Sequence, residues 1–173
     1  HPHTGDLPKD YDHRYIFYEM GYNLKITEMQ AAIGLAQLKK LPKFTAQRIK
    51  NGDYLIKRLA NLPGLIIPKI ISHSQTSWFG FPLTIDPKAP FSRQDLIKFL
   101  HKQRIDTRLL LAGNILKQPY FLASRPRYRV VGKLTNTDII ARQTLWIGCN
   151  PQVELPQLQF IVASIKQFLS RYD

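Results

Sequence analysis

Residues 21–41, GYNLKITEMQAAIGLAQLKKL, place a polar Gly-Tyr-Asn turn directly before a run of small and apolar residues with helical spacing. Thr27 begins the predicted helix, because its hydroxyl can accept a hydrogen bond from the backbone N–H of Gln30 while the Gln30 side chain reaches back to Thr27. The apolar face of this helix comprises Met29, Ala32, Ile33 and Ala36. A core helix needs only a cap, so the turn ahead of it points to an additional function.

The composition is that of a globular chain. Its 173 residues are 44% hydrophobic, which is enough for one domain with a core, or for one domain plus an N-terminal arm. No run approaches the roughly 18 apolar residues of a membrane span, and residues 1–17 lack the basic start and apolar segment of a signal peptide. The single cysteine, Cys149, excludes an internal disulfide framework and fits a reducing compartment. We therefore expect a cytoplasmic protein without membrane association.

The net charge of +13 raises the question of a nucleic-acid partner. The basic residues are scattered along the chain, and those in predicted helices have the spacing of a solvated outer face. We therefore predict no nucleic-acid role. Electrostatic attraction of phosphorylated small molecules is equally compatible with this charge.

Periodicity and turn residues predict the remaining elements. Pro42 ends the first helix or starts the next, which runs from residue 43 to about residue 60. Later helices begin at Ser92, where Asp95 completes a capping box, at Thr135 or Asn136, and across 154–170. Predicted strands are 65–71, an edge strand because it holds Pro68, and then 77–85, 105–110 and 145–148.

This order predicts an α+β fold, in which helices cover one side of a small, mostly antiparallel sheet. We expect an extended arm and turn over residues 1–26, linking helices over 27–62 and an α+β domain over 63–173. The histidines at positions 1 and 3 flank a proline, but no further ligand completes a metal site, so a plain chain terminus is favoured.

The segment 111–133 is predicted to be a long irregular loop, and such loops are usually functional or disordered. Arg108 precedes it, and Asn114, Gln118 and Tyr120 lie within it. Donors and an aromatic ring on one loop suit a polyhydroxylated ligand such as a sugar. The alternative is that Asn114 and Gln118 only hold the loop backbone, and the pattern alone leaves both interpretations open.

No other part of the sequence supplies a complete catalytic site. Trp78 and Trp146 lie in predicted strands and are expected in the core, while Cys149 is expected to be a buried structural thiol. Neither His73 nor His101 has a nucleophile and acid at a recognisable spacing. The sequence also lacks Walker, GxGxxG, HExxH and GxSxG motifs. We therefore predict no catalytic residue and no metal ligand in this chain.

Residues 21–41 resemble the segment that follows the cofactor lysine region in nucleotide-sugar aminotransferases and dehydratases of the aspartate-aminotransferase fold, fold type I. Five further segments resemble one branch, the CDP-4-keto-6-deoxyglucose-3-dehydratases of lipopolysaccharide biosynthesis: SWFGFPLTI, DTRLLLAGN, QPYF, YRVVGKLTNTD and WIG. The segment GDLPKDYDHRY matches the approach to the helix in that branch. The resemblance runs in order from about residue 5 to the C-terminus.

The resemblance implies a role for the turn at residues 21–23. In this family the asparagine of the turn reaches the cofactor phosphate in the neighbouring subunit, and Asn23 takes that place here. Lys25 stands where aminotransferase members usually have arginine, and the dehydratase branch has lysine. A lysine supplies a point charge without a bidentate fork, which fits a sugar substrate that has no carboxylate. Tyr22, Asn23 and Lys25 are therefore the implied cofactor-binding residues.

The resemblance also implies the chemistry of a parent enzyme. Such an enzyme uses pyridoxamine phosphate and a [2Fe-2S] cluster to remove the C3 hydroxyl of a CDP-linked 4-keto-6-deoxy sugar, works as a homodimer and takes electrons from a reductase. Arg108, Asn114, Gln118 and Tyr120 are its expected sugar-binding residues in this chain. Relatives of the aminotransferase type use pyridoxal phosphate instead.

The resemblance places the catalytic base, the cofactor-ring aspartate and the cluster cysteines ahead of residue 1. The position after WIG is normally aliphatic and followed by tyrosine, but here it is Cys149 followed by Asn150. We therefore expect a C-terminal portion of such an enzyme, inactive alone, or a truncated non-catalytic relative that binds a ligand or a partner.

Overall fold

The computed structural model describes residue 22 and residues 24–111, 113–124 and 126–172. Contacts divide the chain into two compact units, His1–Lys39 and Lys40–Asp173. No helix in the described part of the chain is long and apolar enough to cross a membrane. The predicted boundaries at residues 26 and 62 are not tested by this division and stay a prediction.

Helix α1 spans Glu28–Leu59. Its predicted capping box is confirmed, since the Gln30 backbone N–H donates to Thr27 Oγ1 at 3.3 Å and the Thr27 N–H donates to Gln30 Oε1 at 2.8 Å. In the first unit the apolar side chains of this helix face water, with Met29 76% and Ile33 64% exposed. The apolar face predicted from the sequence therefore exists, and no described residue of its own unit buries it.

The prediction that Pro42 separates two helices is wrong, because Pro42 lies inside α1. A proline at this position cannot donate to the carbonyl four residues earlier, so α1 loses one backbone hydrogen bond there. The second part of the helix compensates by burying Leu55 and Leu59 in the core of the second unit. Tertiary packing of this kind outweighs a single unfavourable helical residue.

The sheet has four antiparallel strands in the order β1-β2-β4-β3. The strands are β1 (Leu65–Ile66), β2 (Gly80–Ile85), β3 (Thr107–Leu109) and β4 (Thr144–Gly148). β1 lies at the sheet edge, as predicted, and it ends two residues before Pro68. The predicted alternation is confirmed in β2, where Phe81, Leu83 and Ile85 are all buried.

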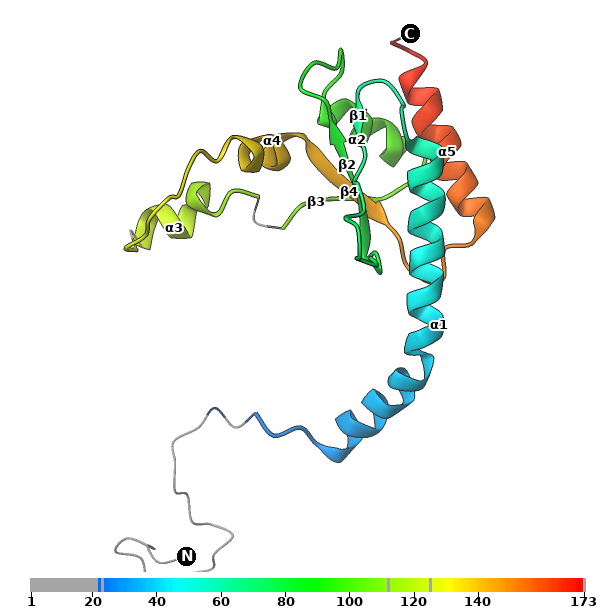
Figure 1. Ribbon diagram of the computed structural model, residues 1–173, viewed down its shortest axis with the longest axis vertical. Helices are drawn as coiled ribbons and strands as arrows, with labels where there is room; N and C mark the ends of the chain where they lie inside the picture. Colours follow the sequence, from blue (N-terminus) through cyan, green and yellow to red (C-terminus); the bar gives the residue numbers. More distant parts are fainter. Residues whose placement is uncertain (1–21, 23, 112, 125, 173) are drawn as a thin grey trace, which may run out of the picture. The chain divides into compact units, whose positions relative to one another are not determined.

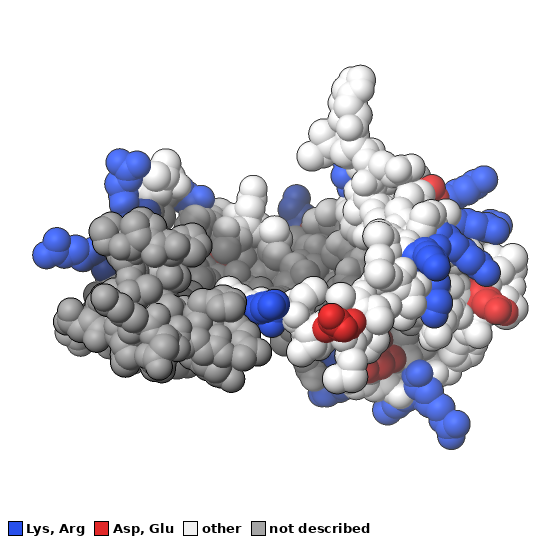
Figure 2. All heavy atoms as spheres, turned by 90° about the horizontal axis from the view of Figure 1, so that it is seen from below, with Lys and Arg blue, Asp and Glu red and all other residues white. Residues whose placement is uncertain are grey.

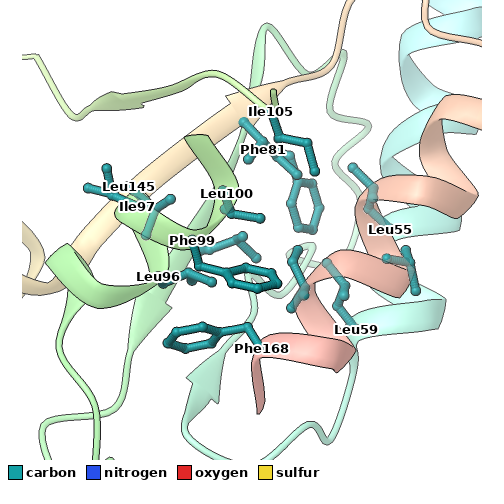
Figure 3. Packing of buried hydrophobic residues seen from close by; sticks show 14 of the residues in the cluster. Leu55, Leu59, Phe81, Leu96, Ile97, Phe99, Leu100, Ile105, Leu145 and Phe168 are labelled. Carbon is teal, nitrogen blue, oxygen red and sulfur yellow. The ribbon is translucent and has the colours of Figure 1, made fainter. Parts of the chain in front are cut away.

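Three helices pack on one face of this sheet (Figure 1). They are the second part of α1, α2 (Arg93–Lys102) and α5 (Leu155–Leu169). Figure 3 shows Leu55 and Leu59 of α1, Leu96, Phe99 and Leu100 of α2 and Phe168 of α5 gathered against Phe81 and Leu145 of the sheet. The predicted α+β class is confirmed, and the sheet is entirely antiparallel.

Capping boxes fix the start of both later core helices. The Asp95 N–H donates to Ser92 Oγ, and Asp95 Oδ2 accepts from the Ser92 N–H at 3.0 Å, as the sequence predicted. The same arrangement joins Glu154 and Gln157 at the start of α5. These local contacts set the helix bounds independently of the rest of the fold.

The segment 111–133 is less irregular than predicted. It contains the 3₁₀ helix η2 (Ile115–Lys117) and the helix α3 (Pro119–Ser124). Helix α4 (Thr135–Gln143) follows and leads directly into β4. Both short helices are too brief to give a periodic hydrophobic signal, which is why the sequence indicated only a loop.

Each tryptophan meets only half of its prediction, since Trp78 packs against the core but lies outside a strand, and Trp146 lies in a strand but outside the core. Trp78 precedes β2 instead of lying in a strand, and its indole packs against Gly52 of α1, where a Cβ atom would lie 2.0 Å from the ring. Trp146 lies in β4, but its neighbours Leu145 and Ile147 face the core, so Trp146 faces the opposite side of the sheet. Both rings are partly buried, and Trp146 is not a core residue.

A pair of phenylalanines, Phe81 in β2 and Phe79 just before it, tests which side chains of this segment stabilise the fold. Replacing the fully buried Phe81 by alanine is expected to cost about 3–5 kcal/mol of unfolding free energy, because it leaves a cavity in the core. Phe79→Ala, at a side chain that is 74% exposed, is expected to cost about 1 kcal/mol or less. Urea unfolding of both variants measures the difference, and equal costs would contradict this core.

Candidate functional site

The loop that follows β3 is held in place at its first residues. The Trp146 indole N–H donates to the carbonyl of Leu109 at 3.1 Å, where β3 ends. Gly113 then has a φ of +55°, and a Cβ atom there would lie 3.2 Å from the Cβ of Ala141 on α4. A left-handed residue this close to a helix favours glycine. The chain therefore enters the loop along a fixed path between the sheet and α4.

Asn114 is the centre of the loop's polar contacts. Its side chain is 6% exposed, its Oδ1 accepts from the backbone N–H of Leu116 at 3.1 Å, and its Nδ2 donates to Asp138 Oδ1 at 2.8 Å. The first bond caps η2, and the second ties the loop to α4. Of the two interpretations left open for Asn114, these contacts favour the one in which it holds the loop backbone.

Lys117 and Asp138 complete this cluster, and sequence reasoning missed both. Lys117 Nζ donates to Asp138 Oδ1 at 2.7 Å. The hydrogen bond from Lys117, followed by the one from Asn114, holds the pKa of Asp138 below the ordinary carboxyl value of 3.8. The two residues are 21 positions apart in the chain, so no local spacing could have paired them.

Gln118 and Tyr120 have different surroundings. Gln118, Asn114 and Lys117 line a hollow of about 280 Å³ whose floor includes Leu110 and Ala141. Tyr120 is 59% exposed, and its ring lies 6.2 Å from that of Phe121. The structure thus gathers two of the four predicted sugar-binding residues around one hollow and leaves the Tyr120 ring facing water.

Arg108 lies elsewhere. Its Nη1 donates to Asp106 Oδ1 at 3.0 Å and lies 2.9 Å from Asp106 Oδ2, so the guanidinium is paired within its own strand region. Arg108 lines a different hollow, of about 400 Å³, together with Trp146. The structure therefore separates Arg108 from Asn114 and Gln118, although the sequence grouped them.

The other candidate residues contain no catalytic arrangement. His101 Nε2 lies 3.0 Å from Thr107 Oγ1 and 3.8 Å from Asp106, on the surface of the second unit. Among the described residues, no group of three or more His, Cys, Asp or Glu side chains could hold a metal ion. Cys149 is fully buried, as predicted, and its Sγ donates to the carbonyl of Arg48 at 3.8 Å.

Residues near the Gly-Tyr-Asn turn belong to the first unit. Tyr22 is 92% exposed and Leu24 is 84% exposed, and Lys25 is also exposed. Asn23, the predicted phosphate ligand, lies outside the described residues.

The positive charge of the chain is distributed, and Figure 2 shows Lys and Arg side chains at separate places on the face in view, with some acidic side chains among them.

Residues 4–166 match the DegT/DnrJ/EryC1/StrS aminotransferase family. The chain belongs to this family. Two curated relatives cover nearly the whole chain. The lipopolysaccharide biosynthesis protein RfbH of Salmonella typhimurium strain LT2 is 46% identical over 95% of the chain. The dTDP-4-dehydro-2,6-dideoxy-D-glucose 3-dehydratase of Saccharopolyspora spinosa is 43% identical over 98% of it.

Solved structures of the DegT/DnrJ/EryC1/StrS family have the same fold. A GDP-4-keto-6-deoxymannose-3-dehydratase with a trapped PLP-glutamate geminal diamine matches 90% of this chain with a TM-score of 0.80 and 28% identity. The chain covers 37% and 36% of the two curated relatives and 40% of that structure. It therefore corresponds to somewhat more than a third of a typical relative.

The residues described here fit only part of a pyridoxal-type cofactor. Lys25 is a cation beside the start of α1, which suits one edge of a phosphate group. The described residues around it include no buried carboxylate for a ring nitrogen, and no paired base. Lys25 is thus the described residue near the turn whose chemistry suits the phosphate of such a cofactor.

Asp138→Asn tests the polar cluster. Because the folded-state pKa of Asp138 is depressed, its contribution to stability is present above the unfolded value near 3.8 and is lost as the pH falls through the lower folded value. The melting temperature of the wild type should exceed that of Asp138→Asn at pH 7, and the two should converge below pH 3.8. Differential scanning calorimetry from pH 7 to pH 2.5 measures this, and a gap independent of pH would contradict the network.

Cys149 provides a test of burial at the end of β4. Burial raises the pKa of the Cys149 thiol to about 11, which the nearby Arg48 guanidinium offsets only in part. At pH 8 roughly one thiol in a thousand is then ionised, so alkylation by iodoacetamide should be at least about a hundred times slower in the native chain than in urea. Mass spectrometry follows the single site, and rapid native labelling would show an accessible, activated thiol instead.

Proposed function

We propose that this chain is the C-terminal portion of a nucleotide-sugar 3-dehydratase, which removes the C3 hydroxyl of a CDP-linked 4-keto-6-deoxyhexose on the way to a 3,6-dideoxyhexose. The observation that carries the proposal is the contrast in identity among relatives. A named 3-dehydratase is 43% identical over nearly the whole chain, whereas two named sugar transaminases are 24% and 25% identical. This contrast favours the dehydratase branch of the family over the transaminase branch.

In this proposal the loop after β3 contacts the sugar. Gln118 and Lys117 line the hollow of about 280 Å³, and Tyr120 offers an exposed hydroxyl and ring. Asn114 is a positioning residue, because its buried side chain holds η2 and α4 together. Arg108 contacts the substrate, as predicted, in one of two ways. Its guanidinium leaves Asp106, or the ligand extends into the hollow of about 400 Å³ that Arg108 lines.

The Gly-Tyr-Asn turn is proposed to bind the phosphate of a pyridoxamine or pyridoxal cofactor in a homodimer. Tyr22, Asn23 and Lys25 would supply an aromatic face, an amide donor and a positive charge. When bound, such a cofactor would supply an amine for the sugar ketone and a methylene proton, whose removal would provide the electron pair that allows the C3 oxygen to leave. A [2Fe-2S] cluster, its reductase and a cytoplasmic location belong to the same proposal.

Two other functions compete with this one. The first is a pyridoxal-phosphate-dependent sugar aminotransferase, which the family relationship and the transaminase relatives support. The second is a non-catalytic relative that binds a ligand or a partner.

Titration calorimetry distinguishes these functions at the level of binding. We expect the 173-residue chain to bind a CDP-sugar more tightly than the matching GDP- or dTDP-sugar. Gln118→Ala and Tyr120→Ala should each weaken binding by about tenfold, the loss of one hydrogen bond to a ligand. Gln159→Ala, an exposed glutamine on α5, is the matched control. Absence of binding, or equal affinity in all variants, would contradict the sugar-binding loop.

The same chain should form no dehydration product when it is mixed with pyridoxamine phosphate and a CDP-4-keto-6-deoxy sugar, because the family resemblance places the catalytic base ahead of residue 1. Mass spectrometry of the sugar measures the product. Clear turnover would show that the chain is a complete enzyme. An open reading frame ahead of His1 that encodes the cofactor-binding region would identify it as part of a longer protein.

A further inference from the structure

The larger hollow of the second unit lies at the free edge of the sheet. It has a volume of about 400 Å³ and is lined by residues of β3, β4 and α5, with Arg104 and Asp106 at its side. A smaller hollow of about 210 Å³ shares Arg104 and Asp106 and adds His101. The larger volume is in the range of small-molecule sites. Neither hollow includes the loop residues proposed above to bind the sugar.

Arg104 holds an unfavourable backbone conformation beside these hollows. Its φ is +60°, in the left-handed region that side chains other than glycine and asparagine rarely adopt. The Arg104 N–H donates to the carbonyl of His101, and the Ile105 N–H donates to that of Leu100, both at 2.9 Å. These two bonds form a Schellman motif at the end of α2, in which the left-handed residue is usually glycine. A cation at this helix end gains from the macrodipole, but glycine would avoid the unfavourable φ, so the side chain of Arg104 is a candidate for a further contact.

The charges around the larger hollow leave one positive charge uncompensated. Arg108 is paired with Asp106, whose carboxylate also accepts from the Thr107 N–H at 2.9 Å. Arg104 has no ion pair within 4.0 Å among the described residues. Two guanidinium groups therefore line one hollow with a single carboxylate between them, and a guanidinium fork matches the oxygens of a phosphate.

Aromatic surface completes the lining. The Trp146 ring is held by its bond to the Leu109 carbonyl and lies against Gly80, where a Cβ atom would be 2.2 Å from the ring. Phe160 of α5 lines the same hollow with half of its surface exposed. Fixed rings beside arginines suit a ligand that has both a flat heterocycle and a phosphate.

We propose that this hollow is a binding site for a nucleoside monophosphate, distinct from the sugar-binding loop, in which Arg104 holds the phosphate, Phe160 of α5 lines the space for the base and Trp146 borders the hollow from β4. Arg108 supports the phosphate contact from within its pair with Asp106. Gln157, which also lines the hollow, offers an amide to the polar edge of the base. The proposal does not require the chain to take part in sugar dehydration.

Nuclear magnetic resonance of the 173-residue chain tests the site directly. The chain has two tryptophans, so its spectrum shows two indole N–H signals, which Trp146→Phe assigns. Titration with adenosine monophosphate should shift the Trp146 signal in a saturable way, with half-saturation below about 1 mM, and leave the Trp78 signal in place. Ribose 5-phosphate and adenosine, each lacking one half of the ligand, should bind at least tenfold more weakly.

Arg104→Gly separates binding from folding. Glycine is preferred at a left-handed position, so this variant should melt roughly 1–3 °C higher than the wild type while binding adenosine monophosphate at least tenfold more weakly. Arg127→Gly, which removes an exposed arginine elsewhere, should leave binding unchanged. Unchanged binding in Arg104→Gly, equal binding of ribose 5-phosphate, or no shift of the Trp146 signal would each overturn the proposal.

Discussion

Two polar side chains on the second part of α1 hold the ends of the central strands, and the geometry of the sheet depends on them. Arg48 Nη1 donates to the carbonyl of Trp78 at 2.7 Å and to that of Cys149 at 3.3 Å. Asn51, 1% exposed, donates to the carbonyls of Asn150 and Val153 at 3.1 and 2.9 Å. These carbonyls lie just before β2 and just after β4, whose ends pair through Gly80 and Gly148. Backbone acceptors buried there need such donors, so α1 fixes both the position of the sheet and the approach to α5.

The features that could be predicted from the sequence are those set by neighbours in the chain. The capping boxes at Thr27 and Ser92 need only residues three positions apart, and the alternation of β2 needs only one buried face. The passage of α1 through Pro42 could not be predicted, because it depends on Leu55 and Leu59 finding a core made by the sheet. Local propensity is weak beside packing of that kind.

In the candidate site, too, contacts between neighbours in the chain could be predicted, whereas contacts between distant residues could not. The sequence selected Asn114 as a sugar-binding residue, which stays a prediction, but its partner Asp138 lies 24 positions away and is brought near only by α4. Arg108 was grouped with the loop because it is close in sequence, whereas alternation along β3 and the pair with Asp106 direct it to another hollow. Arg104 carried no signal at all, since a left-handed arginine is recognised only from the backbone angle.

The first part of α1 has a consequence for the behaviour of the chain in solution. Met29 and Ile33 lie one helical turn apart and are 76% and 64% exposed, and no described residue of the first unit covers them. Water is a poor solvent for a continuous apolar stripe, so any two such stripes gain free energy by meeting. Any association through this stripe would depend on the concentration of the chain by mass action.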